Sequence, residues 1–294
     1  MHQAETLEKI MAGTTKKKKI SPMATADILP RVISISSGKG GVGKTNIVTN
    51  LAYCLAKMGK KTLILDADLN LANVDVLLGI TPKYNLHHVF LGEKSLSDII
   101  VEGPGGMMIL PASSGVMEMG DLTEEQKLYF LSEITELGNS IDILLIDTAA
   151  GLNNNVIYFT LAAQERIIVL TPEPTSMTDA YAMIKVLSSR HDVKKFRILV
   201  NSAQSEKEAR GVYRQITLVA DRFLDTLSLD YLGFIPHDPK LRQAVRAQKL
   251  VSELSPKAAI SSQFLNLAEQ IRQEEITPHL DGNIQFFWQG LFNL

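Results

Sequence analysis

The chain has 294 residues, of which 45% are hydrophobic and 21% charged, and its formal net charge is −2. This composition supports one large or two small folded domains and argues against a broad basic surface for nucleic acid. Its one cysteine, Cys54, cannot form an internal disulfide, so we expect a buried core thiol. Because no run of about 18 apolar residues and no signal-peptide pattern is found, we expect a cytoplasmic protein.

Residues 1–30 precede the predicted core. Residues 2–11 can form a short amphipathic helix with Ala4, Leu7 and Ile10 on one side. Four consecutive lysines at 16–19 then lead toward the core through a stretch that contains serine and proline. We interpret the lysines as part of a solvated tether, and adhesion to anionic lipid or to an acidic partner is the alternative.

The most informative stretch spans residues 31–59. A β-branched run leads into the sequence GKGGVGKT, and a helix with apolar periodicity follows. This is the P-loop pattern G-x-x-x-x-G-K-[ST] in its strand–loop–helix context, where backbone N–H groups and a helix N-terminus surround phosphate oxygens. We therefore predict that a nucleoside triphosphate binds to Gly38, Lys39, Gly40, Gly41, Val42, Gly43, Lys44 and Thr45.

Three side chains of this loop have separate predicted roles. Lys44 is expected to reach the β- and γ-phosphates, and the Thr45 hydroxyl to ligate Mg²⁺. Lys39 is a second lysine that an ordinary P-loop does not need.

Strand and helix patterns alternate along the rest of the chain, as in a parallel sheet covered on both faces. We predict strands at residues 32–36, 62–66, 107–111, 141–147, 167–171, 197–201 and 229–235. Predicted helices include residues 178–189, 212–227 and 258–273. The expected fold is an α/β P-loop NTPase with a mostly parallel twisted sheet, and one ATPase domain is expected over residues 31–275.

Two acidic sequences follow predicted strands. DADLNLANVD begins at Asp66, and DILLIDTAAG is a hydrophobic strand that ends in Asp147, the Walker B pattern whose carboxylate holds Mg²⁺ through a water. In a parallel sheet both strand ends open beside the P-loop. Asp68 is then free to orient an attacking water, and Gly151 lets its loop shift when the γ-phosphate leaves.

Residues 276–294 form the C-terminal segment, which ends in GNIQFFWQGLFNL. On a helix, an apolar stripe shares one face: Ile284, Phe287, Trp288, Leu291 and Leu294. The last eleven residues would span about 16 Å, too short to cross a bilayer. The segment can lie in a membrane interface, or it can dock on its own domain or on a partner. No Lys or Arg follows Arg272, so any membrane affinity must come from aromatic burial.

These motifs resemble the deviant-Walker-A ATPases, which include MinD, ParA and their relatives. The resemblance rests on KGGVGKT with its extra lysine, on DADLNLANVD and on the Walker B strand, and it covers about residues 31–275. Gln3, Ala4 and Leu7 are similar to the DQAxxLR activator motif of the FlhG/FleN (YlxH) proteins, although His2 and Glu8 replace its Asp and Arg. The tether and the FFWQGLF ending are also similar to that group.

The resemblance implies a face-to-face homodimer around ATP. Lys39 would reach the partner's nucleotide, Asp68 would position the water, and Asp66 and Asp147 would support the Mg²⁺. The adenine would lie near Asn201 and the segment formed by Pro236, His237 and Asp238. The ATP dimer would bind the inner face of the bacterial membrane through its tail. It would act with an FlhF-like GTPase and with flagellar basal-body proteins or transcription regulators, and so set flagellar number and placement.

Two other functions share this ATPase core. A MinD-type division-site regulator normally starts close to its P-loop and ends in a basic amphipathic helix, and this chain does neither. A ParA-type DNA segregation ATPase needs a basic surface, and the net charge of −2 argues against direct DNA binding.

Overall fold

The computed structural model describes residues 30–68, 73–111, 129, 132–133, 136–138, 140–224 and 227–274. The predicted partner-binding and membrane-binding side chains lie outside the described residues: Gln3, Ala4, Leu7, Ile284, Phe287, Trp288 and Leu291. Their roles, and the proposed boundaries at residues 30 and 275, stay predictions.

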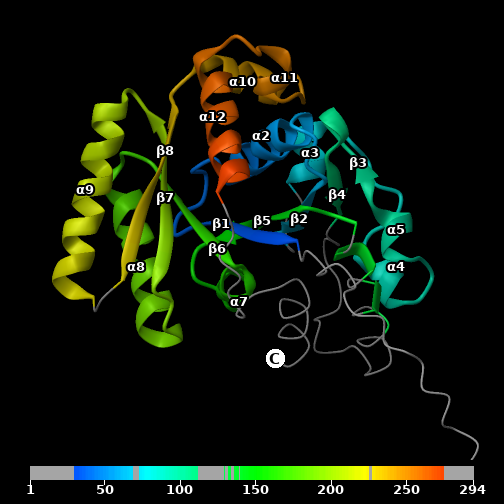
Figure 1. The fold of residues 1–294 in the computed structure, drawn as a ribbon, viewed down its shortest axis with the longest axis horizontal. Helices are drawn as coiled ribbons and strands as arrows, with labels where there is room; N and C mark the ends of the chain where they lie inside the picture. The colour runs from blue at the N-terminus through cyan, green and yellow to red at the C-terminus, as the bar shows by residue number, and fades with distance from the viewer. Residues whose placement is uncertain are drawn as a thin grey trace, which may run out of the picture.

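An eight-stranded sheet forms the centre of the fold (Figure 1), in the order β3-β4-β2-β5-β1-β6-β7-β8. Its strands are β1 (Arg31–Ser37), β2 (Thr62–Ala67), β3 (Val101–Glu102), β4 (Met108–Leu110), β5 (Ile143–Ala150), β6 (Glu165–Leu170), β7 (Lys195–Ala203) and β8 (Ser228–Pro236). All neighbouring strands are parallel except the antiparallel pair β3–β4. The central strands β1 and β2 are buried along their whole length, which explains their aliphatic sequences.

Helices cover both faces of this sheet (Figure 1). One face carries α2 (Lys44–Lys57), α3 (Val74–Leu78), α10 (Pro239–Arg246), α11 (Val251–Leu254) and α12 (Ala259–Gln273). The other carries α4 (Leu86–Phe90), α5 (Leu96–Ile99), α7 (Asn154–Ala162), α8 (Pro174–His191) and α9 (Glu206–Phe223). A short 3-10 turn, η1 (Pro104–Gly106), precedes β4. Among the described residues no helix is both long and apolar enough to cross a membrane.

The predicted α/β fold is confirmed, and all seven predicted strands are present. The predicted helix 212–227 was wrong at both ends. It begins at Glu206, because the Ser205 side chain accepts the Glu208 N–H and caps the first turn, and it ends at Phe223. The helix predicted from residue 178 begins at Pro174, since proline is tolerated in the first turn. Cys54 is buried in α2, as predicted.

The parallel strands bring several distant loops to one edge of the sheet. Asp147 of β5 is in register with Ile35 of β1 on one side and with Asp66 of β2 on the other. At the same edge, Pro236 of β8 is in register with Ala203 of β7. The P-loop, the two acidic strand ends and the loops after β7 and β8 therefore lie together beyond the carboxyl ends of the strands.

Candidate nucleotide site

The P-loop connects β1 to α2, and its glycines meet specific steric demands. A Cβ on Gly38 would lie 2.2 Å from the carbonyl oxygen of Asp179 in α8, so only glycine fits between the loop and that helix. Gly43 has φ +92°, and a Cβ there would lie 2.5 Å from Nδ2 of Asn201. Asn201 donates from this nitrogen to the carbonyl of Val42 at 2.6 Å. The loop is therefore held by α8 on one side and by the end of β7 on the other.

Lys44 is the first residue of α2, and its side chain turns back toward the loop. Its Nζ donates to Oγ of Ser37 at 2.9 Å, and the residue is buried. Burial lowers the pKa of Lys44, and the nearby carboxylates of Asp147 and Asp68 oppose that change. A desolvated ammonium at a helix N-terminus is suited to a polyanionic ligand.

The carboxyl group of Asp147 is buried beside the P-loop. The strand was predicted to end at Asp147, but β5 continues to Ala150, because Ala150 is still paired with Ser37 of β1. Burial raises the pKa of Asp147 to about 7, while a hydrogen bond with Thr45 and the charge of Lys44 act in the opposite direction. Its Oδ1 has no hydrogen-bond partner in the described part of the chain. Such an orphaned oxygen beside a threonine hydroxyl fits Mg²⁺, which uses one or two carboxylates together with phosphate oxygens.

Asp66 and Asp68 organise the chain that follows β2. The Asp66 carboxylate accepts the backbone N–H groups of Asp68 at 3.1 Å, Asn73 at 2.9 Å and Val74 at 3.1 Å. Burial raises the pKa of Asp66 to about 6, and these hydrogen bonds act against that rise. Asp68 is only partly buried and accepts from Nδ2 of Asn73 at 3.3 Å. Asp66 thus anchors the start of α3, whereas among the described residues the Asp68 side chain accepts one long hydrogen bond, from Asn73.

Lys39 points away from the loop that carries it. Its Nζ bonds to Oε2 of Glu173 at 2.7 Å and to Oγ1 of Thr175 at 2.9 Å. Both partners lie at the beginning of α8, and the Lys39 side chain is 37% exposed. The lysine is therefore held at the surface beside the phosphate-binding loop rather than inside it.

The residues predicted to surround the adenine lie together beyond β7 and β8. The side-chain oxygen Oδ1 of Asn201 accepts the N–H of Ser202, whose φ is +58°. The N–H of His237 donates to the carbonyl of Ala203 at 2.9 Å, and its Nδ1 lies 3.0 Å from Oγ of Ser202. Asp238 caps α10 by accepting the Lys240 N–H at 2.9 Å. The loop from Pro236 to Asp238 is thus fixed beside Asn201 and the P-loop.

Comparison with known proteins places this geometry in a family. A protein-family model described as an AAA domain matches residues 30–199. The antiactivator FleN of Pseudomonas aeruginosa is 43% identical over 261 residues, which cover 89% of this chain and 93% of FleN. The flagellum site-determining protein YlxH of Helicobacter pylori is 35% identical over 238 residues, covering 81% of this chain and 80% of YlxH. The chain belongs to the FleN/YlxH family.

Membership of the FleN/YlxH family confirms the resemblance seen in the P-loop and acidic motifs. Among solved structures, the septum site-determining protein MinD of Pyrococcus horikoshii in complex with Mg-ADP matches with a TM-score of 0.64 and 28% identity. That match covers 83% of this chain and 97% of MinD. The FleN/YlxH chain therefore has the fold of the MinD-type ATPases.

Four neighbours of the FleN/YlxH site were missed by the sequence reasoning: Ser37, Glu173, Thr175 and Ser202. Ser37 immediately precedes the P-loop motif and could have been found there. Glu173 and Thr175 follow β6 with no motif of their own, and only the packing of α8 against the P-loop brings them to Lys39. Ser202 is recognisable only by its left-handed backbone.

We expect Asp147→Asn to stabilise the nucleotide-free protein while abolishing Mg²⁺-dependent ATP hydrolysis. The pKa of this carboxyl is about 7 in the folded protein and about 4 when unfolded. Between these values the folded state binds more protons, so its free energy of unfolding falls as the pH rises. Asparagine removes this pH-dependent loss of stability, and at pH 8 we expect the free energy of unfolding to rise by up to about 4 kcal/mol, or about 10 °C in Tm.

Thermal unfolding at pH 5 and pH 8 tests this expectation. The control substitution is Asp142→Asn. Asp142 precedes β5 and makes an exposed contact, in which it accepts the Lys61 N–H. The explanation fails if Asp147→Asn unfolds at the same temperature as the native sequence at pH 8, or if its gain is equally large at pH 5.

Proposed function

We propose that this protein is an ATP-dependent switch that dimerises around ATP, hydrolyses it, and controls flagellar number and placement. The observation that supports the ATPase cycle is the meeting of Lys44, Asp68 and Asp147 at one edge of the sheet. The observation that supports the flagellar role is the similarity to an antiactivator FleN over 89% of this chain and to a flagellum site-determining YlxH.

Each residue of the site has one task in this cycle. The P-loop N–H groups and the Lys44 ammonium bind the phosphates. Asn201 and residues 236–238 bind the adenine. Thr45 and Asp147 hold Mg²⁺, which when bound neutralises charge on the phosphates. Asp66 supports the Mg²⁺ site indirectly, because it fixes the loop that carries Asp68. Asp68 orients the attacking water, and Lys39 reaches the nucleotide of the second protomer.

The cellular test is the flagellar pattern of a strain that lacks the gene. We expect electron microscopy to show an altered number or position of flagella, restored by the native gene and not by a Lys44→Ala allele. Unchanged flagella together with misplaced septa would support the MinD-type division-site role. Salt-sensitive binding of the purified protein to nonspecific DNA would support the ParA-type role instead.

We propose that residues 276–294 anchor the ATP dimer to lipid, so binding should depend on nucleotide. The stripe of Ile284, Phe287, Trp288 and Leu291 would bury about 400 Å², or roughly 10 kcal/mol before the cost of ordering and immobilisation is subtracted. One tail should therefore bind weakly, and two tails on one dimer should bind much more tightly. Vesicle co-sedimentation is expected with ATP, little is expected with ADP, and Trp288→Glu should abolish it.

Because no Lys or Arg lies in residues 276–294, added salt should weaken this sedimentation only modestly. Equal sedimentation with ATP and ADP, or none with either nucleotide, would instead make the segment a docking helix.

We propose that residues 1–11 activate an FlhF-like GTPase. Deleting them should leave basal ATPase activity and dimerisation unchanged, because the described site begins with β1, but should remove stimulation of the partner's GTP hydrolysis. Gln3 is the side chain expected to enter the partner's site, with Ala4 and Leu7 packing beside it. A phosphate-release assay with both proteins gives the readout, and full stimulation by the truncated protein would reduce this segment to a tether.

A further inference from the structure

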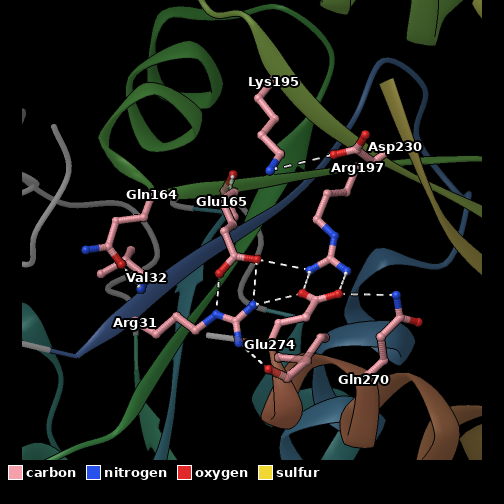
Figure 2. Close-up of polar contacts among 11 residues, drawn as sticks. Arg31, Val32, Gln164, Glu165, Lys195, Arg197, Asp230, Gln270 and Glu274 are labelled. Carbon is pink, nitrogen blue, oxygen red and sulfur yellow. Dashed lines mark hydrogen bonds and ion pairs between the residues drawn. The ribbon is translucent and has the colours of Figure 1, made fainter. Parts of the chain in front are cut away.

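A partly buried ionic cluster lies at the amino ends of the strands, at the sheet edge remote from the nucleotide site. Figure 2 shows its four members, which we call the clasp: Arg31, Glu165, Arg197 and Glu274. Arg31 and Glu165 are the first residues of β1 and β6, and Arg197 is the third residue of β7. Glu274 immediately follows the last residue of α12. The clasp therefore joins the two ends of the core, where residues 1–30 enter it and residues 275–294 leave it.

Both arginines of the clasp contact both glutamates. Arg31 bonds to the two oxygens of Glu165, with Nη2 to Oε2 at 2.8 Å, and reaches Oε2 of Glu274 at 3.4 Å. Arg197 lies 3.1 Å from Oε2 of Glu165 and 2.7 Å from each oxygen of Glu274. The Arg31 and Arg197 side chains are only 6% and 9% exposed.

Charge balance makes this arrangement specific. Burial alone would raise the pKa of Glu165, but the hydrogen bonds and charges of Arg31 and Arg197 outweigh it and lower that pKa. The two guanidinium groups are buried, and an unpaired buried charge is costly. Glu165 is 21% exposed and Glu274 38% exposed, and these two carboxylates balance the two cations. The end of α12 is therefore held where Glu274 can reach both arginines.

The clasp also caps α12. Arg31 donates through Nη1 to the carbonyl of Ile271, one of the last carbonyls of the helix, which lack intrahelical partners. Gln270 of the same turn donates to Glu274 at 3.3 Å. Helix α12 also contacts α2, the helix that begins in the P-loop, and its buried residues Phe264 and Leu267 belong to the same hydrophobic core as α2. The helix is therefore packed on the P-loop helix and bonded to the strand ends at its last turn.

We propose that the clasp holds the departure points of the N-terminal and C-terminal segments together, so that both segments act from one shared exit on the edge opposite the nucleotide site. A protein bound by residues 1–11 is then held beside whatever surface residues 276–294 contact. The statement about a bound protein rests on the proposed function, whereas the shared exit itself depends only on the clasp.

Hydrogen exchange at the last turn of α12 tests the clasp without lipid, nucleotide or partner. Glu274→Gln removes the charge that meets both arginines, and we expect the amides of residues 271–274 to exchange about tenfold faster or more. The matched control is Glu269→Gln in the same helix, where Glu269 pairs with the exposed Arg272 rather than with the strand ends. Native protection in Glu274→Gln, or equal loss in the control, would overturn the proposal.

The distance between the two ends of the core is a second and independent measurement. Spin labels on Lys61→Cys and Gln273→Cys should lie within about 30 Å of each other, because Lys61 and Arg31 both donate their N–H groups to Asp142 and Gln273 directly precedes Glu274. The native thiol does not interfere, since Cys54 is buried and burial raises its pKa to about 11. Glu274→Gln should broaden the distribution toward longer distances. A separation well beyond 30 Å in the otherwise native chain would overturn the shared exit, whatever the outcome of the lipid and GTPase assays.

Discussion

Lys39→Ala is expected to bind ATP almost as well as the native protein but to remain monomeric and to lose turnover by about 100-fold or more. The Lys39 ammonium is held at the surface by Glu173 and Thr175, and it takes no part in the phosphate-facing contacts of its own loop. Removing it should therefore spare the nucleotide pocket. It would, however, remove the positive charge that we propose reaches the nucleotide of the second protomer.

Glu173→Gln provides the matched control, since it releases Lys39 from its ion pair without removing the lysine. That variant should still dimerise with ATP, and Lys44→Ala should fail at the earlier step of nucleotide binding. Size-exclusion chromatography with light scattering and a phosphate-release assay provide the two readouts. A complete ATP-bound dimer of Lys39→Ala would exclude the proposed reach across the interface.

Asp68→Ala is expected to bind ATP and to dimerise, but to hydrolyse ATP about 100-fold more slowly or worse. The side chain follows the end of β2 in a loop that is held through Asp66, and its contact with Asn73 is long. Because Asp66 rather than Asp68 fixes the backbone, the substitution should leave the loop in place while removing the carboxylate that we propose orients the attacking water. In cells the variant should stay bound to membrane longer and repress flagellation more strongly.

The control for this variant is Asp75→Ala, which removes a nearby carboxylate in α3 whose contact is with the Val76 N–H. Its turnover should match that of the native protein in the same phosphate-release assay. Native turnover by Asp68→Ala would remove this residue from the mechanism. Loss of ATP binding by Asp68→Ala would instead show that Asp68 is needed to form the nucleotide pocket.

The sequence by itself determined the features of this protein whose physical requirements are local. GKGGVGKT predicts a phosphate loop because glycine conformations, a helix N-terminus and a lysine suffice within eight consecutive residues. The aliphatic runs predict buried parallel strands, and a hydrophobic strand ending in Asp147 predicts its place beside that loop. β5 continues past Asp147 to Ala150, but the position of Asp147 beside the loop agrees with the prediction, because parallel strands bring their carboxyl ends to one edge.

Tertiary structure alone decided the contacts that join distant parts of the chain. Glu173 meets Lys39 across 134 positions, and Arg31 meets Glu274 across 243. Neither pair carries a local signal, since a charged residue at the end of a strand or helix is ordinary in sequence. The orphaned oxygen of Asp147 is likewise a consequence of burial between β1 and β2. The order of strands in the sheet and the packing of α8 and α12 determine which charged side chains are removed from water together. That shared desolvation is why these side chains pair with one another.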